Sequence, residues 1–281
     1  MIPIRERTRF TAELLAALPD LRHLAQTGQG VAHIDVKAAT QLGIAVSVTT
    51  GGSAQSVAEL TLGLLLALVH RVGEGDRAMR RGEWPTLLGS EVGGTTLGLV
   101  GLGEIGTEVA VRARAFGMRV LAWSPNLTAE RAQPHGAEAV SLDELIAQSD
   151  FLSIHIRLTD QTRGLLSYDR LRRAKPGLVL INTSRGPIAP GPDVPRALQD
   201  GVLGGAALDV FDEEPLPAGH PFTTLPNVIL TPHVGWTTQE TYERFFAGAV
   251  GNLRAFDNGT PEHVVNPDAV QRRPLGLSGL G

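Results

Sequence analysis

The sequence contains no cysteine, which excludes disulfides, thiolate nucleophiles and cysteine metal ligands. It also lacks an apolar run long enough to span a bilayer, and the longest one, around residues 60–69, is typical of a buried helix. No apolar stretch follows the early positive charge of Arg5, so we expect no signal peptide and a cytoplasmic protein.

Positive charge is not in excess either. The formal net charge is −4, which gives no reason to expect nucleic acid or an anionic membrane as a partner. With 42% hydrophobic and 19% charged residues, the 281-residue chain has a globular composition and a length that suits two domains. Several histidines are scattered without metal-ligand spacing, so we expect them to be structural or exposed and expect no metal site: His23, His70, His135, His220 and His263.

Short aliphatic runs alternate with amphipathic segments in the second part of the chain. The runs are residues 97–101, 119–123, 151–156, 178–182, 205–210 and 227–231. They are nearly free of polar residues, as in strands that are buried on both faces of a parallel sheet. Ser141 and Glu144 form a capping box for one of the intervening helices. The pattern predicts a doubly wound α/β sheet.

The first part of the chain predicts a second, smaller α/β unit with a parallel sheet. We expect helices over residues 11–18 and 35–42 and strands over 21–25 and 44–48. One long linking helix, with a continuous apolar stripe from Val57 to Val72, is expected over 53–80, and a returning helix over 239–256. We therefore expect a dinucleotide-binding domain over residues 54–235 and a substrate domain formed by 1–53 and 236–281, whose last residues, 271–281, have few apolar anchors.

A glycine-rich segment follows the strand expected at 97–101. Gly101, Gly103 and Gly106 have the spacing G-x-G-x-x-G, and a helix is expected from Glu104 onward. Such glycines can simply form a tight turn, but a position between a strand and a helix is typical of a dinucleotide-binding loop. There Gly101 would allow the turn, Gly103 the approach of a pyrophosphate, and Gly106 the packing of helix on strand.

The strand at 119–123 ends in a way that leaves the cofactor choice open. An acidic residue about 20 residues after the glycines normally accepts the ribose hydroxyls of NAD. Ser124 occupies this place and carries no charge to repel a 2′-phosphate, and no arginine follows immediately to attract one. We expect NAD or NADP, with a slight preference for NAD.

Three further strand ends each carry a reactive side chain: Arg185, Glu214 and His233. Because ligands bind outside the carboxyl ends of strands in open α/β sheets, these side chains should converge. Arg185 can bind a carboxylate bidentately, and His233 can transfer a proton near neutral pH. Glu214 can fix the imidazole tautomer. Taken singly, each residue could equally be a surface residue, a capping residue or one half of an ordinary ion pair; the hypothesis depends on their occurring together.

With these motifs the chain resembles the D-isomer-specific 2-hydroxyacid dehydrogenases, a family that includes phosphoglycerate dehydrogenases and glyoxylate/hydroxypyruvate and D-lactate reductases. The resemblance covers nearly the whole chain. It depends on Ser56-Val57-Ala58-Glu59-Leu60, the glycine loop, Asn182-Thr183-Ser184-Arg185-Gly186, Leu208-Asp209-Val210-Phe211 with Glu214-Pro215, and Thr231-Pro232-His233-Val234-Gly235.

The resemblance implies a role for each motif. Arg185 would bind the carboxylate and keto group of a 2-oxo acid, and Glu214 would pair with the acid/base His233. Asp209 would accept a hydrogen bond from the nicotinamide carboxamide, and the substrate carboxylate would also meet the loop of Gly51 and Gly52. The expected cofactor contacts are Gly101, Gly103, Glu104, Ile105, Gly106, Ser124, Thr183, Ser184, Arg185, Asp209, His233 and Gly235. A homodimer held largely by the cofactor domains is also implied.

The chain departs from the family pattern at three places. Residues 2–8 match what usually follows a first strand and helix of about 30 residues or more, so we expect a truncated substrate domain. Ser124 replaces the usual acid. Prolines after Ile188 delay the next helix, which we expect to start near Pro192.

We expect an NAD(P)-dependent oxidoreductase that interconverts a small 2-oxo acid and its D-2-hydroxy acid. Two alternatives remain. One is a dinucleotide-responsive binding protein without turnover, like the corepressors that share this fold, although no partner-docking extension is visible. The other is an inactive or unstable product of the truncated substrate domain. The individual 2-hydroxy acid cannot be deduced from the sequence.

Overall fold

The computed structural model describes residues 2–4 and 8–272. It divides the chain into two compact units, one formed by Met1–Gly52 with Thr237–Gly281 and the other by Ser53–Trp236. Each is an α/β unit with a parallel sheet, so the predicted fold class is confirmed. Most of the C-terminal tail lies outside the described residues.

The first unit contains a three-stranded parallel sheet in the order β1 (Ile2–Ile4), β2 (His23–Gln26) and β3 (Ala45–Val48). The sequence did not predict β1. Side chains of β2 alternate between the two faces of the sheet. Leu24 belongs to the apolar core with Leu15 and Ile44, whereas His23 stacks on Phe256. The helices of this unit are α1 (Ala12–Ala16), α2 (Val36–Gln41), α10 (Gln239–Asp257) and α11 (Asp268–Arg272).

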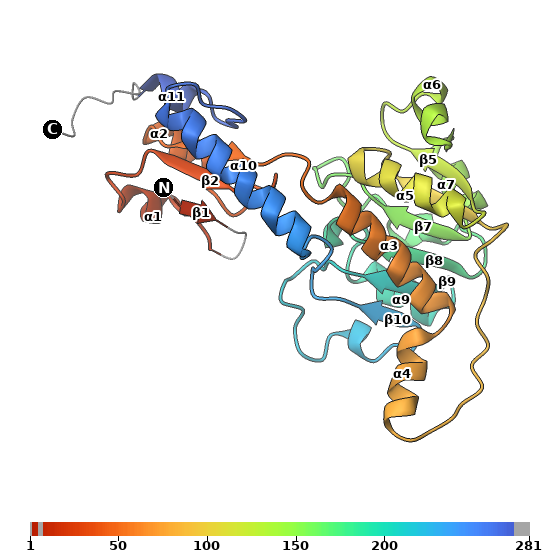
Figure 1. Ribbon diagram of the computed structural model, residues 1–281. Helices are drawn as coiled ribbons and strands as arrows, with labels where there is room; N and C mark the ends of the chain where they lie inside the picture. The colour runs from red at the N-terminus through yellow and green to blue at the C-terminus, as the bar shows by residue number, and fades with distance from the viewer. Residues whose placement is uncertain (1, 5–7, 273–281) are drawn as a thin grey trace. The chain divides into compact units, whose positions relative to one another are not determined.

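The second unit contains a seven-stranded, wholly parallel sheet in the order β10-β9-β8-β7-β4-β5-β6. Figure 1 labels β5, β7, β8, β9 and β10 of this sheet. Its strands are β4 (Thr96–Val100), β5 (Arg119–Trp123), β6 (Glu138–Ala139), β7 (Phe151–Ile154), β8 (Leu178–Asn182), β9 (Leu203–Leu208) and β10 (Val228–Leu230). The strand order reverses between β4 and β7. In such a sheet, ligands bind outside the carboxyl ends of the strands at this reversal.

Helices cover both faces of the large sheet. On one face α3 (Ala54–Val69) packs on α5 (Glu104–Ala115), and their core includes Leu62, Leu99 and Val109. On the other face lie α7 (Leu142–Gln148), α8 (Tyr168–Leu171) and α9 (Asp193–Gln199), and their core includes Leu145 and Leu180. Shorter elements are α6 (Ala129–Ala132), η1 (Gln133–His135), η2 (Gly186–Ile188) and η3 (Pro221–Thr223). Burial on both faces explains why the strands read as continuous aliphatic runs.

Two local predictions about helix starts are confirmed. The side chain of Ser141 accepts from the Glu144 amide and Glu144 bonds back to Ser141, so the capping box of α7 is complete. Helix α9 begins at Asp193 with Pro192 at its N-cap, as the prolines before it predicted.

The prediction of a single long helix over residues 53–80 is wrong. The segment forms α3 and a separate α4 (Val72–Arg80), bent by 65° from one another. Arg71 between them has φ 56°, a left-handed conformation that ends a right-handed helix. In the described part of the chain, no single helix is both long and apolar enough to cross a membrane; α3 and α4 meet that test only when they are counted as one bent pair.

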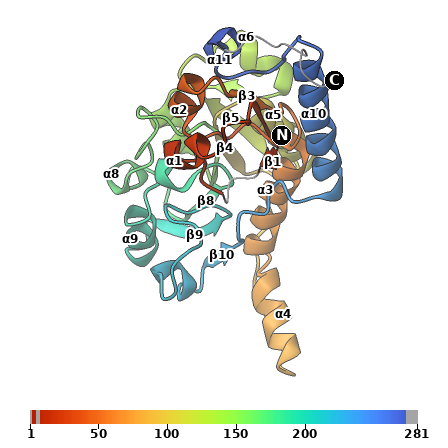
Figure 2. The ribbon, with the colours of Figure 1, turned by 90° about the vertical axis from the view of Figure 1, so that its left-hand side faces the viewer.

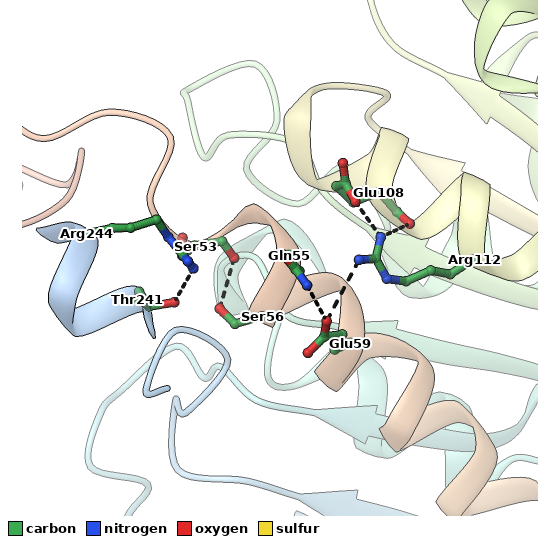
Figure 3. A network of polar contacts seen from close by, with 8 residues as sticks. All are labelled: Ser53, Gln55, Ser56, Glu59, Glu108, Arg112, Thr241 and Arg244. Atoms are coloured by element: carbon green, nitrogen blue, oxygen red, sulfur yellow. Dashed lines mark hydrogen bonds and ion pairs between the residues drawn. The ribbon is translucent and has the colours of Figure 1, made fainter. Parts of the chain in front are cut away.

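An ion-pair network joins the exposed surfaces of α3 and α5 (Figure 3). Arg112 forms an ion pair with Glu108 one turn earlier and lies 3.8 Å from the Glu59 carboxylate. Gln55 donates to the same Glu59 carboxylate over 3.0 Å. Because these side chains are partly solvent-exposed, the network contributes little to the unfolding free energy, and the apolar contacts beneath it hold α3 on α5.

Candidate active site

The glycine loop between β4 and α5 leaves one side open for a ligand. Gly101 has φ 107°, and a Cβ there would lie 2.6 Å from the His155 carbonyl oxygen. A Cβ on Gly106 would lie 2.1 Å from the Gly101 oxygen, so both positions require glycine for packing. A Cβ on Gly103 would meet no atom within 4 Å. Close backbone approach at Gly103 is therefore possible from outside, which fits the pyrophosphate of a dinucleotide.

The first turn of α5 supplies the groups that such a phosphate needs. Glu104 and Ile105 are its first residues, and no side chain caps the helix at Gly103. Amides in a first helical turn have no carbonyl partner within the helix, and they bind anions readily. Ser124, at the end of β5, is tied to the loop because its Oγ accepts from the Leu102 amide over 3.1 Å.

The loop after β8 that carries Arg185 is shaped by Asn182, which is 1% exposed. Asn182 accepts from the Ser184 amide at 3.0 Å and donates to the Arg185 carbonyl at 3.0 Å. The Ser184 hydroxyl donates to the Ile156 carbonyl at 2.6 Å. These bonds leave the Arg185 guanidinium exposed at the carboxyl edge of the sheet, with one N–H donated to the Ser184 carbonyl.

Thr183 in the same loop is buried and anchors it to α3. Its Oγ1 lies 3.0 Å from Oγ1 of Thr61, which donates in turn to the Val57 carbonyl. Gly186, which follows the arginine, packs so closely on the next loop that a Cβ would lie 2.2 Å from the Phe211 carbonyl carbon. The loops after β8 and β9 are therefore held against one another.

Glu214 and His233 form a hydrogen-bonded pair. Nδ1 of His233 lies 2.7 Å from Oε2 of Glu214, and Oε1 of Glu214 accepts from the Phe211 amide at 2.9 Å. His233 has φ 55°, an unusual conformation for a residue with a side chain. Glu214 therefore fixes the orientation of the imidazole ring through Nδ1.

The charges around Glu214 favour its ionised form. Burial alone would raise its pKa, but the hydrogen bonds from His233 and the Phe211 amide, together with the positive charges of His233 and Arg185, lower the net pKa below its ordinary value. A carboxylate held ionised beside an imidazole stabilises the imidazolium. Arg185 is among the positive charges that favour the ionised form of Glu214.

Asp209, at the end of β9, organises the loop that carries His233. It is 1% exposed, and Oδ1 accepts from the Thr231 hydroxyl and the Val234 amide while Oδ2 accepts from the Gly235 amide. The resemblance implied a contact of Asp209 with the nicotinamide. The structure shows in addition that Asp209 binds residues on both sides of His233, namely Thr231 before it and Val234 and Gly235 after it. The sequence analysis did not predict this positioning role.

His155, at the carboxyl end of β7, is a buried group that the sequence analysis missed. Its Nε2 lies 2.8 Å from the Ser153 hydroxyl, and burial lowers its pKa to about 3, so the ring is neutral under ordinary conditions. Its backbone forms the floor under Gly101. The only sequence signal was a histidine within an otherwise aliphatic strand.

A cavity of about 440 Å³ opens beside the Ser124 loop. It is lined by side chains from the end of β5, from the loop between β7 and α8, and from α7 and α8 near their starts: Trp123, Pro125, Ser141, Leu142, Asp143, Gln161, Thr162, Leu165 and Arg170. Mixed apolar and polar lining of this kind suits a flat ring with a few hydrogen-bonding groups.

Gly51 and Gly52, the expected substrate loop, belong to the first unit and follow β3. Gly51 has φ 73°, which glycine adopts without strain. A Cβ on Gly52 would lie 2.2 Å from the Phe245 ring, and the Gly52 carbonyl accepts from Nε of Arg244 at 2.8 Å. Helix α10 therefore shapes this loop within its own unit.

Comparison with known proteins agrees with this geometry. Residues 62–235 match the family model described as the NAD binding domain of D-isomer specific 2-hydroxyacid dehydrogenases. The chain is 42% identical to a glyoxylate reductase of Aeropyrum pernix over 96% of its own length and 83% of that protein. Two solved structures superpose closely. One is a putative D-3-phosphoglycerate dehydrogenase from Ralstonia solanacearum, at TM-score 0.87 and 38% identity, covering 96% of this chain and 83% of that one. The other is the TT0316 protein from Thermus thermophilus, at TM-score 0.84 and 41% identity, covering 92% and 84%.

The chain belongs to the D-isomer specific 2-hydroxyacid dehydrogenase family. The predicted family and reaction class are thereby confirmed: it is an oxidoreductase that transfers a hydride between a nicotinamide dinucleotide and a 2-oxo or 2-hydroxy acid. The alternative of a binding protein without turnover is disfavoured, because the matches to relatives named as reductases cover almost the whole chain.

Proposed function

We propose that the protein reduces a small 2-oxo acid such as glyoxylate to the corresponding 2-hydroxy acid, with Arg185, Glu214 and His233 as the catalytic residues. The observation that carries this assignment is the 2.7 Å contact between Nδ1 of His233 and Oε2 of Glu214, in electrostatic contact with Arg185. The names of the relatives, glyoxylate reductases at about 40% identity, support the small substrate.

Each catalytic residue has one task. Arg185 binds the substrate carboxylate and polarises the adjacent carbonyl, since its exposed guanidinium can form two parallel hydrogen bonds. His233, protonated and held through Nδ1 by Glu214, gives a proton from Nε2 to the carbonyl oxygen. The reduced nicotinamide supplies the hydride that the carbonyl carbon accepts.

The cofactor is held by backbone and side-chain groups at the carboxyl edge of the large sheet. Glu104 and Ile105 present first-turn amides to the pyrophosphate, with Gly103 giving access. The cavity beside Ser124 would hold the adenosine half. Thr183, Ser184, Asp209 and Gly235, at the ends of β8, β9 and β10, would hold the nicotinamide half, with Asp209 as an acceptor for the carboxamide.

A substrate screen tests the proposal. Oxidation of NADH and of NADPH is followed with glyoxylate, hydroxypyruvate, pyruvate and 3-phosphohydroxypyruvate at equal concentrations. We expect glyoxylate or hydroxypyruvate to give a kcat/KM at least about tenfold above that of 3-phosphohydroxypyruvate. Tight cofactor binding without turnover of any 2-oxo acid would contradict the proposal and favour a binding protein.

We also propose that the protein is a cytoplasmic homodimer that pairs through the segment after α3. In Figure 2, α4 projects away from the sheet of its unit. Trp84 and Leu88, which follow it, are 87% and 88% exposed, and Val72 and Met79 are about half exposed. Large apolar side chains exposed together typically mark a contact surface. In sedimentation experiments, Trp84→Glu with Leu88→Glu should give monomers, whereas Leu42→Glu in the first unit should not.

A further inference from the structure

The end of β5 combines an uncharged residue with an arginine that comes from further along the chain. Ser124 stands where an acid would normally bind the adenosine ribose of NAD. Its Oγ already accepts a hydrogen bond from Leu102, so its own hydrogen is free to be donated to a ligand oxygen. The position therefore attracts an anion weakly and repels none.

The guanidinium of Arg131 lies over the same turn. Residues 124–127 form a turn closed by the hydrogen bond from the Leu127 amide to the Ser124 carbonyl. Nη1 of Arg131, on α6, donates to the carbonyl of Asn126 in this turn at 2.9 Å. An arginine from the following helix is thereby held at the turn that begins with Ser124.

The backbone of Arg131 is fixed although its side chain is exposed. The next residue, Ala132, is fully buried in the core of the α3–α5 face, and the Arg131 amide bonds to the Thr128 carbonyl. Among the residues that the structure describes, no carboxylate lies within ion-pair distance of the Arg131 guanidinium. The adjacent Glu130 instead bonds its own amide and the Thr128 hydroxyl. The remaining N–H groups of Arg131 are free for a ligand.

We propose that Arg131 and Ser124 form a subsite for the 2′-phosphate of NADPH, and that NADPH is bound more tightly than NADH. This inference depends on the dinucleotide placement in the proposed function. It replaces the slight preference for NAD that the sequence suggested, since Arg131 lies too far along the chain for the sequence to place it. A phosphate at the ribose 2′ position would accept from the guanidinium and from the serine hydroxyl. NADH offers a hydroxyl there, which Ser124 can bind but Arg131 cannot use as a charge partner.

Binding titrations test the subsite without requiring turnover. Dissociation constants for NADPH, NADH, adenosine 2′,5′-bisphosphate and 5′-AMP are measured for the unaltered protein and for Arg131→Gln. We expect Arg131→Gln to weaken NADPH and the bisphosphate about tenfold or more, and NADH and 5′-AMP less than about threefold. Raising the salt concentration should reduce the NADPH advantage in the unaltered protein only.

Arg119→Gln is the matched control. Arg119 lies at the other end of the same strand, is about half exposed and pairs with Glu138 at 2.7 Å. The Arg119→Gln substitution removes the same charge, so it should change neither the NADPH/NADH ratio of dissociation constants nor the corresponding ratio for adenosine 2′,5′-bisphosphate and 5′-AMP. Equal weakening of NADPH and NADH by Arg131→Gln, or tighter binding of NADH by the unaltered protein, would overturn the inference. If selective NADPH binding is found but no 2-oxo acid is reduced, the proposed function fails while the subsite stands.

Discussion

The carboxylate of Asp209 accepts a hydrogen bond from the amide of Gly235 over 2.9 Å, and its other oxygen accepts from Val234 at 2.8 Å. These two bonds, with a third from Thr231, fix the turn in which His233 has its unusual backbone conformation. A buried carboxylate with this many donors acts as a structural clamp on the catalytic loop.

The clamp predicts a kinetic defect without global unfolding. In Asp209→Asn, one backbone amide would face an NH₂ group instead of an oxygen, so we expect kcat to fall about tenfold or more while the circular dichroism spectrum is unchanged. Asp212→Asn is the control, because Asp212 is exposed in the same loop and accepts a hydrogen bond from the Gly191 amide. Normal kcat in Asp209→Asn would show that the loop holds its shape by other contacts.

Removal of the acid/base should separate turnover from cofactor binding. We expect His233→Ala to abolish measurable reduction and to change the dissociation constant of the reduced cofactor by less than about threefold. The measurements are steady-state oxidation of the cofactor and fluorescence titration. Unaltered turnover would remove His233 from the mechanism.

Glu214 should set the pH dependence of reduction. Its lowered pKa keeps it negative through neutral and mildly acidic pH, and this charge favours protonated His233. In Glu214→Gln the imidazolium loses its proton more easily as the pH rises, so the alkaline limb of kcat/KM for reduction should move to lower pH. Glu213→Gln, at the exposed neighbouring carboxylate, should leave the profile in place. A shift to higher pH in Glu214→Gln would refute the electrostatic assignment.

The strand ends were predictable because parallel strands buried on both faces have a distinctive composition. Gly101, Gly103 and Gly106 could be assigned from their context between a strand and a helix, and the structure gives each a separate steric reason. The triad depended on knowing that carboxyl ends of strands meet at one edge, and the contact between His233 and Glu214 follows from that topology.

Features set by one backbone angle or one side-chain conformation were not predictable. The apolar stripe of α3 continues to Val72, so periodicity gave no sign of the break at Arg71. In the structure Leu64 is buried and Val72 is 56% exposed, although both lie on that stripe. The hydrogen bond from the Arg131 side chain to the Asn126 carbonyl likewise depends on a turn whose geometry the sequence does not specify.

Arg185 should contribute to both substrate binding and catalysis. We expect Arg185→Lys to raise KM for the 2-oxo acid and to lower kcat together, because a single ammonium cannot reproduce two parallel hydrogen bonds to a carboxylate. Arg173→Lys, an exposed arginine 3.5 Å from Asp143, should change neither constant. A defect confined to cofactor affinity would contradict the assignment of Arg185.

Ser124→Asp should reverse the cofactor preference. A carboxylate at the end of β5 would repel a 2′-phosphate and accept from the ribose hydroxyls, so the NADH/NADPH ratio of kcat/KM should rise about tenfold or more. The Leu102 amide can still donate a hydrogen bond to the new side chain, so the conformation of the glycine loop should be preserved. If the unaltered protein already rejects NADPH completely, another residue decides the choice.

The first unit should lose stability in acid because of His23. This residue is 1% exposed, stacks on Phe256 at 4.4 Å and bonds Ser47 at 2.8 Å. Burial lowers its pKa to about 4, against an opposing effect of Asp257. Above about pH 6.5, the unperturbed pKa of histidine, the ring is neutral in both folded and unfolded chains. Below that pH the unfolded chain binds a proton that the folded chain excludes, until the folded pKa is reached.

The unfolding free energy of this unit should therefore fall by about 1 kcal/mol per pH unit between pH 6 and pH 4.5 through His23 alone. The tryptophans, Trp84, Trp123 and Trp236, all belong to the other unit, so hydrogen exchange of the β2 and β3 amides at graded urea concentrations is the appropriate measurement. His23→Gln should lower stability at pH 7, since the stack is lost, but should flatten the acid slope by that amount. His70→Gln, at an exposed histidine, should leave the slope unchanged. A slope that persists in His23→Gln would mean that other groups carry the acid sensitivity.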